Sequence, residues 1–177
     1  MARHTPPAKL EARDADGRTA LLRATRANNI GAAKELIEAG ADVNAKDAIQ
    51  DTPFLYAGAE GRLEILRLTL AAGANLKDTN RYGGTALIPA CHHGHQETVR
   101  ELLKTSIAID HINRLGWTAL LETILLSDGG PVHQEILQQL LKAGANPSLT
   151  DSDGVTPREH AQKRGYTKMV QMLEALL

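Results

Sequence analysis

One cysteine and three histidines lie close together in the middle of the chain, at Cys91, His92, His93 and His95. A thiolate and imidazoles are ligand types that zinc prefers, so the cluster raises the hypothesis of a metal- or redox-responsive protein. Adjacent residues on a helix point about 100° apart, however, and do not converge well on one ion. We therefore expect no metal site and no cofactor, and keep this function as the alternative.

Nucleophilic catalysis needs a Ser or Cys activated by a nearby base, and the sequence carries no sign of one. It has no Gly-x-Ser-x-Gly turn, and Cys91 beside His92 is adjacency in sequence rather than pairing in space. The motifs of phosphate-binding loops, dinucleotide-binding folds and zinc proteases do not occur either. The sequence therefore predicts a protein that is not an enzyme and has no catalytic residues.

The composition narrows the function classes further. The 177 residues include 20 Lys and Arg and 21 Asp and Glu, a formal charge of −1, so no overall field attracts nucleic acid or anionic lipid. No apolar run is long enough for a membrane span, and the N-terminal stretch lacks the apolar part of a secretory signal. With Cys91 as the single cysteine, we expect a cytoplasmic protein, or a periplasmic one if a signal peptide was removed.

The sequence repeats with a strict period, and this period predicts the elements that would position any functional site. Five threonines follow one another at intervals of 33 residues and finally 38: Thr19, Thr52, Thr85, Thr118 and Thr156. They define units over 14–46, 47–79, 80–112, 113–150 and 151–177, which together form the domain 14–177. Residues 1–13 precede the first unit, and we expect them to form a poorly ordered tail or a partial cap.

Each unit contains the start and stop signals of two helices. The threonines stand at helix N-caps, with Pro53 or Pro157 at the first helical position. Gly61, Gly94 and Gly165 then stand where the first helix must end and the chain must reverse. A second helix follows, with apolar residues at helical spacing. Because so short a helix pair cannot bury its own apolar face, the units must stack on one another.

The units resemble a known family. The stretch YGGTALIPACHHGHQETVRELL at 82–103, and its counterparts in the other units, are similar to the ankyrin repeat, which joins a β-turn finger to two antiparallel helices. The match covers nearly the whole chain and looks most like small bacterial ankyrin proteins. It implies an all-α ankyrin-repeat solenoid of five helix-turn-helix repeats with β-turn fingers.

Three local departures from the pattern lead to separate predictions. Gln50 replaces the finger glycine of the second unit, which weakens the prediction of a tight turn there. Pro89 stands one turn into a first helix, so that helix should begin loosely or kink. The fourth unit carries five extra residues around SDGGPV at 127–132, which predict a longer loop rather than more helix. We favour neutral drift over a contact role for this loop.

The resemblance implies that a partner protein binds at the finger tips and on the concave face of the first helices. The candidate residues at these positions are Ile49, Asp51, Tyr56, Arg81, Tyr82, His92, Arg114, Leu115, Trp117 and Glu122. Aromatic residues and Arg dominate the energy of many interfaces. Tyr82 and Trp117 could instead lie flat across adjacent fingers and stiffen them. We expect a monomeric, non-enzymatic protein-protein interaction module, acting as an inhibitor or a scaffold.

Overall fold

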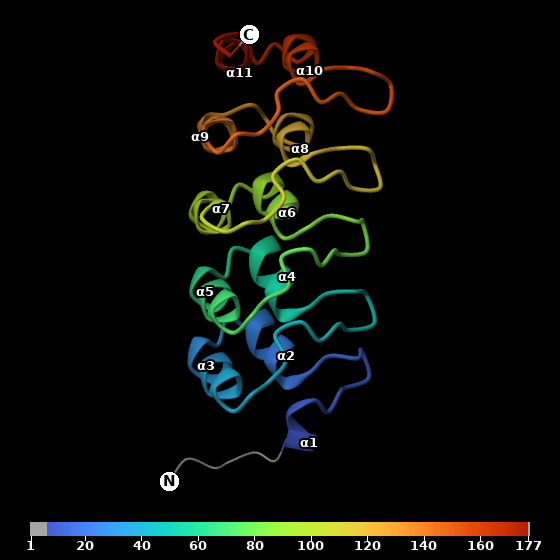
Figure 1. Cartoon of the computed structure of the whole chain (residues 1–177), viewed down its shortest axis with the longest axis vertical. Coiled ribbons are helices and arrows are strands. Elements are labelled where there is room, and N and C mark those ends of the chain that lie inside the picture. The colour runs from blue at the N-terminus through green and yellow to red at the C-terminus, as the bar shows by residue number, and fades with distance from the viewer. Residues whose placement is uncertain (1–6, 177) are drawn as a thin grey trace.

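A computed structural model of the chain describes residues 7–176, and these form helices joined by loops (Figure 1). Residues 1–6, which belong to the expected tail, and Leu177 lie outside the described residues. A short helix, α1 (Pro7–Leu10), comes first. Five helix pairs follow it: α2 (Ala20–Arg26) with α3 (Ile30–Glu38), α4 (Pro53–Ala59) with α5 (Leu63–Ala71), α6 (Leu87–His92) with α7 (Gln96–Leu103), α8 (Ala119–Leu125) with α9 (Pro131–Lys142), and α10 (Pro157–Lys163) with α11 (Thr167–Glu174).

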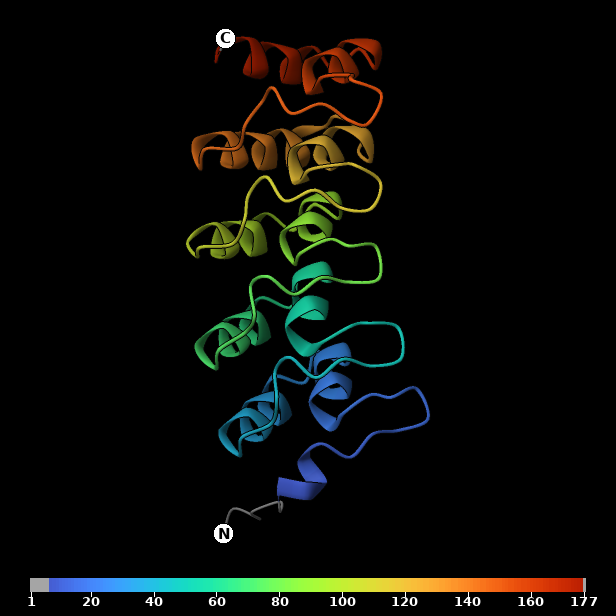
Figure 2. The same ribbon diagram turned by 45° about the vertical axis from the view of Figure 1, so that its right-hand side comes forward.

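The helix pairs stack along one axis in two layers. The first helices of the pairs form one layer and the second helices the other, and the fingers project together beyond the first layer (Figures 1 and 2). Each first helix contacts the first helix of the next pair, and the second helices do the same. The described residues contain no strand, which confirms the predicted all-α solenoid. At the N-terminal end, Leu10 of α1 is buried in the hydrophobic core.

The core is a column rather than a single centre. Leu21, Phe54, Leu87 and Leu120 stand 33 residues apart, each in a first helix, and all four are almost completely buried. Each of the first four repeats thus contributes one large apolar side chain to the same level of its first helix. Stability in such a stack is a sum of repeat terms and of interfaces between neighbouring repeats.

In four of the five pairs, the first helix begins at the predicted threonine cap. A threonine Oγ1 accepts the backbone N–H of the third residue after it at Thr19, Thr52, Thr118 and Thr156. Thr85 is the exception: α6 begins only at Leu87, and the buried Thr85 Oγ1 has no hydrogen-bond partner. The expected cap there is wrong because Pro89 lacks the N–H that would bond Thr85 O, as Tyr56 bonds Thr52 in α4. The predicted loose start is confirmed.

An Asp or Asn organises each finger. Its Oδ1 accepts backbone N–H groups two and four residues later, at Asp14, Asp47, Asn80, Asn113 and Asp151. The second finger keeps its tight turn although Gln50 sits at φ 71°, so the expected weakening is not seen. Neighbouring fingers are also joined: Arg114 N donates to Tyr82 O at 3.0 Å. The fingers are therefore ordered before any partner arrives.

A second set of contacts joins the repeats at the turns between their helices. A side chain from each later repeat donates to a backbone carbonyl that ends the first helix of the repeat before it, or follows that helix. The four contacts are Arg62 Nη2 to Arg26 O at 3.3 Å, His93 Nδ1 to Ala59 O at 2.6 Å, His133 Nε2 to His92 O at 2.8 Å and Tyr166 Oη to Ser127 O at 2.6 Å. They satisfy carbonyls that have no partner within the helix.

The extra residues of the fourth repeat add helix as well as loop. The linker 126–130 is two residues longer than the three-residue linkers elsewhere, and α9 has 12 residues where α3 has 9. The expectation of a loop alone was wrong, because Pro131 at the first helical position starts α9 instead of breaking it. The linker packs against the last repeat, with Gly129 lying against the Tyr166 ring.

Candidate functional site

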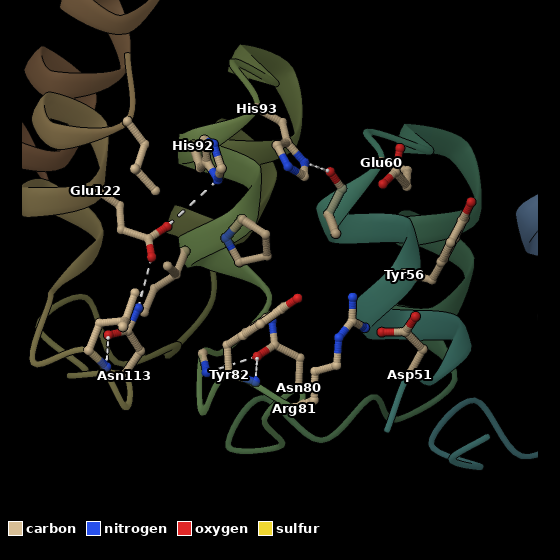
Figure 3. Close-up of a pocket in the computed structure, with 16 residues that line it drawn as sticks. Asp51, Tyr56, Glu60, Asn80, Arg81, Tyr82, His92, His93, Asn113 and Glu122 are labelled. Carbon is tan, nitrogen blue, oxygen red and sulfur yellow. Dashed lines mark hydrogen bonds and ion pairs between the residues drawn. The ribbon is translucent and has the colours of Figure 1, made fainter. Parts of the chain in front are cut away.

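A groove of about 400 Å³ lies where the central fingers meet helices α4, α6 and α8 (Figure 3). Seven of the ten predicted partner-binding residues line it: Asp51, Tyr56, Arg81, Tyr82, His92, Leu115 and Glu122. The remaining lining residues are Ala59, Glu60, Asn80, Gly84, Ile88, Pro89, His93, Asn113 and Leu126. The 33-residue register thus brings side chains from three repeats to one surface.

The other three predicted residues lie outside the groove. Ile49 is exposed on the second finger, and Trp117 is half-buried in the fourth finger. Arg114 packs against Gly83 and donates from Nη1 to Arg81 O at 2.7 Å, so this side chain bridges the third and fourth fingers. The sequence suggests Tyr82 and Trp117 as the residues that stiffen adjacent fingers, and in the structure Arg114 makes this contact between fingers.

The two tyrosines of the groove each carry a guanidinium on one ring face. Arg26 lies over Tyr56 at 4.8 Å from the ring centroid, and Arg81 lies over Tyr82 at 4.6 Å. Tyr82 keeps 57% of its surface exposed, and neighbouring Leu115 keeps 54%. Large aromatic and apolar side chains exposed to this extent offer contact area that a partner can bury.

Glu122 lies at the other side of the groove with its side chain only 9% exposed. Its Oε1 accepts a hydrogen bond from Asn113 Nδ2 at 2.8 Å. The ionisable nitrogen that lies near Oε2 is His92 Nδ1, at 4.0 Å. Burial raises the pKa of Glu122, and the Asn113 hydrogen bond offsets this only in part. Burial, with His93 and His133 nearby, lowers the pKa of His92, which disfavours the charged form of the ring that could pair with Glu122.

A second half-buried carboxylate, Asp51, faces the groove from the second finger. Burial raises its pKa, and the negative charge of Asp47 adds to this effect. The positive charge of Arg81 acts in the opposite direction. The groove therefore holds two carboxylates, Asp51 and Glu122, whose charged forms are disfavoured by their surroundings.

Asn113 and Glu60 line the groove but were missed by sequence reasoning, and His93, which also lines it, was considered only as a member of the Cys91 cluster. The repeat register carried the signal for Asn113, which stands nine residues before Glu122. In the last repeat the residues at the same two positions, Asp151 and His160, are in contact at 2.6 Å. No comparable pairing in the sequence points to Glu60 or His93.

The Cys91 and histidine cluster does not converge on one point. Cys91 is completely buried, and burial raises the pKa of its thiol. His92 lines the groove, His93 bonds Ala59 O, and His95 packs its ring against the preceding repeat at Gly61. Within residues 7–176, no group of three or more His, Cys, Asp or Glu side chains is placed to hold a metal ion. The same residues include no helix with the length and apolarity of a membrane span.

We expect Glu122→Gln to raise the free energy of unfolding by about 1 kcal/mol at pH 7, because Gln removes a buried charge and keeps the acceptor for Asn113. The raised pKa of Glu122 means that its ionised form opposes folding. The gain should therefore be full at neutral pH, shrink as the pH falls through the raised pKa, and vanish below the ordinary value of 4.5. Urea denaturation at several pH values measures it.

Glu64→Gln is the matched control, because Glu64 is exposed and pairs with Arg67 at 2.7 Å. We expect it to change stability by less than about 0.5 kcal/mol. A loss of stability in Glu122→Gln at pH 7 would mean that the Glu122 carboxylate is compensated in the folded chain.

Most of the chain matches known ankyrin repeats. A family model of ankyrin repeats in three copies matches residues 54–151, and a model of the single ankyrin repeat matches residues 16–48. Among curated proteins, the chain is 51% identical over 55 residues to the ankyrin repeat protein YahD of Escherichia coli (strain K12). That match covers 31% of this chain and 27% of YahD, so it spans about a quarter of that relative.

Two solved structures are similar over most of their length. An ankyrin repeat domain from Acinetobacter baumannii AYE, ABAYE2397, is 61% identical with a TM-score of 0.92, covering 94% of this chain and 85% of that one. The ankyrin repeat protein EF0377 is 41% identical with a TM-score of 0.91, covering 93% of this chain and 84% of that one. The fold thus has close counterparts in solved proteins.

Proposed function

The chain belongs to the ankyrin repeat family, and from this we propose that it binds a partner protein in the groove between its central fingers and first helices. Ankyrin repeat proteins are generally protein-interaction modules. The observation that carries the proposal is the exposure of Tyr82 and Leu115 on the rim of a groove lined from three repeats. The interaction itself involves no catalytic step.

Rigid presentation is the mechanism we propose. The finger backbone is held by Asn80 and Asn113, and the third and fourth fingers are joined by a hydrogen bond and by Arg114. A partner that binds such fingers orders little of this chain, so the contact area of Tyr82 and Leu115 contributes to affinity with little entropic cost.

The role of the complex is either to block the partner, as an inhibitor does, or to hold it, as a scaffold does. We propose a monomer as the binding unit, with residues 14–177 acting as one domain, and the cytoplasm as its compartment, with the periplasm as the alternative. The burial of the single Cys91 supports either compartment equally, because a sheltered thiol resists oxidation.

The test compares the wild type with a Tyr82→Ala, Leu115→Ala variant. Wild-type protein is used as bait in a lysate of the native host, the captured protein is identified by mass spectrometry, and its affinity for both chains is then measured with purified components. We expect the variant to bind on the order of 30-fold more weakly, which is about 2 kcal/mol. Both side chains are more than half exposed, so the variant should fold normally.

An Ile30→Ala, Val132→Ala variant is the control, since both side chains are similarly exposed but do not line the groove. It should bind like the wild type. Equal affinity of the wild type and the Tyr82→Ala, Leu115→Ala variant for the captured partner would overturn the assignment of the groove.

A further inference from the structure

Charged side chains of α5, α7 and α9, in the second-helix layer, are paired with one another. Arg67 and Arg100 each bind two carboxylates, one from their own helix and one from the next repeat, at distances from 2.5 to 3.3 Å. Lys104 adds a further pair on this face. These carboxylates already form ion pairs within the chain, so an external cation would gain little by binding them.

The groove differs from that face. Three carboxylates line it, Asp51, Glu60 and Glu122, and among the described residues none has a Lys or Arg nitrogen within 4.0 Å. Arg81 is the one guanidinium of the described lining, and it lies over the Tyr82 ring. The carboxylates of the groove lining therefore outnumber its guanidinium groups, and none of them forms an ion pair with a Lys or Arg of the described residues.

Glu122 is the carboxylate of the groove that is best placed to contact a cation of a partner. Its side chain is more than nine-tenths buried, and Asn113 occupies Oε1. The other oxygen, Oε2, has no hydrogen-bond donor, and the carboxylate points into the groove (Figure 3). Oε2 is not among the fully buried atoms that lack a partner, so it is open to the groove and can accept a further hydrogen bond. A positively charged donor from a partner would make a stronger hydrogen bond to it than a neutral donor.

We propose that the occupant of the groove is a basic segment of the partner, which sets a Lys or Arg side chain against Glu122 and an apolar side chain against Tyr82 and Leu115. This inference rests on the proposed function and names the chemistry of the partner for that same groove. Asp51 and Glu60 lie across the groove from Glu122, with Tyr82 between the two sides (Figure 3). A second cation of the segment binds at that side, while Tyr82 and Leu115 supply the apolar wall between them.

The test uses a displayed library of random 12-residue peptides as the probe. Selection is run in parallel on the wild type, on Glu122→Gln and on the control Glu64→Gln, and affinities of individual synthetic peptides are then measured. We expect peptides enriched in Lys and Arg on the wild type and on Glu64→Gln. Binding of these peptides to Glu122→Gln should be at least about tenfold weaker, because the charge is lost while the shape is kept.

Two outcomes would overturn the inference. Enriched peptides without an excess of Lys and Arg, or equal binding to Glu122→Gln, would show that Glu122 does not recognise a cation. Failure to enrich any peptide would show that a linear basic segment is not the occupant. The proposed function fails on a different result, namely unchanged binding of the captured partner to the Tyr82→Ala, Leu115→Ala variant.

Discussion

Phe54→Ala is expected to lower the free energy of unfolding by about 4 kcal/mol, the largest effect among the substitutions considered. Phe54 is the only phenylalanine of the chain and is completely buried in α4. Because α4 contacts both α2 and α6, the lost ring leaves a cavity that weakens two interfaces at once. Urea denaturation followed by circular dichroism measures the loss.

Phe54→Leu is the control for this effect. It keeps most of the apolar volume and matches the Leu at the same level of the neighbouring repeats, Leu21 and Leu87, so we expect a cost of less than about 1.5 kcal/mol. A cost below about 2 kcal/mol for Phe54→Ala itself would mean that the stack closes around the cavity, and that the core column is less tightly packed than its burial indicates.

Gly129→Ala is expected to cost about 3 kcal/mol, for two reasons that add. Gly129 has a φ of 72°, where a Cβ costs about 1 kcal/mol or more. A Cβ there would also lie 2.5 Å from Cδ1 of Tyr166, so the ring would have to move and its hydrogen bond to Ser127 O would be lost. The loss should appear in urea denaturation, together with weaker hydrogen-exchange protection in α10 and α11.

Gly165→Ala separates the two causes. Gly165 has a φ of 70°, but a Cβ at this position meets nothing within 4 Å. We expect it to cost only about 1 kcal/mol, the conformational part of the effect. If Gly129→Ala and Gly165→Ala cost the same, the contact between the linker and Tyr166 contributes nothing to stability.

The fold was predictable because its signals are local and repeated. A threonine cap, a turn residue and an apolar helix face recur in each repeat. The equivalent positions of the other repeats therefore still predict the fold where one position departs from the pattern. Thr85 shows the limit, since its cap depends on an N–H that Pro89 four residues later does not have. The linker around Gly129 shows another, because whether Pro131 ends a loop or starts a helix depends on packing against the last repeat.

The site was predictable only in outline. Register places Tyr82 and Glu122 on the groove side of their repeats, and the structure shows both in its lining. The bond between Glu122 and Asn113 lies within the fourth repeat, but the approach of His92 to Glu122 and the lowered pKa of His92 arise from contacts between repeats. Position can be read from a periodic sequence, whereas the electrostatic state of a side chain requires its neighbours in space.

The contacts that join the repeats at their helix turns have a consequence for how the chain can evolve. Every donor belongs to the later repeat and every acceptor to the earlier one, as with His93 and Ala59 O. A duplicated internal unit such as 47–79 would copy one donor, Arg62, and one acceptor, Ala59 O, together. Gene duplication within the array can therefore lengthen the protein without creating an unmatched junction, whereas units joined from unrelated arrays would need both halves of the contact to be rebuilt.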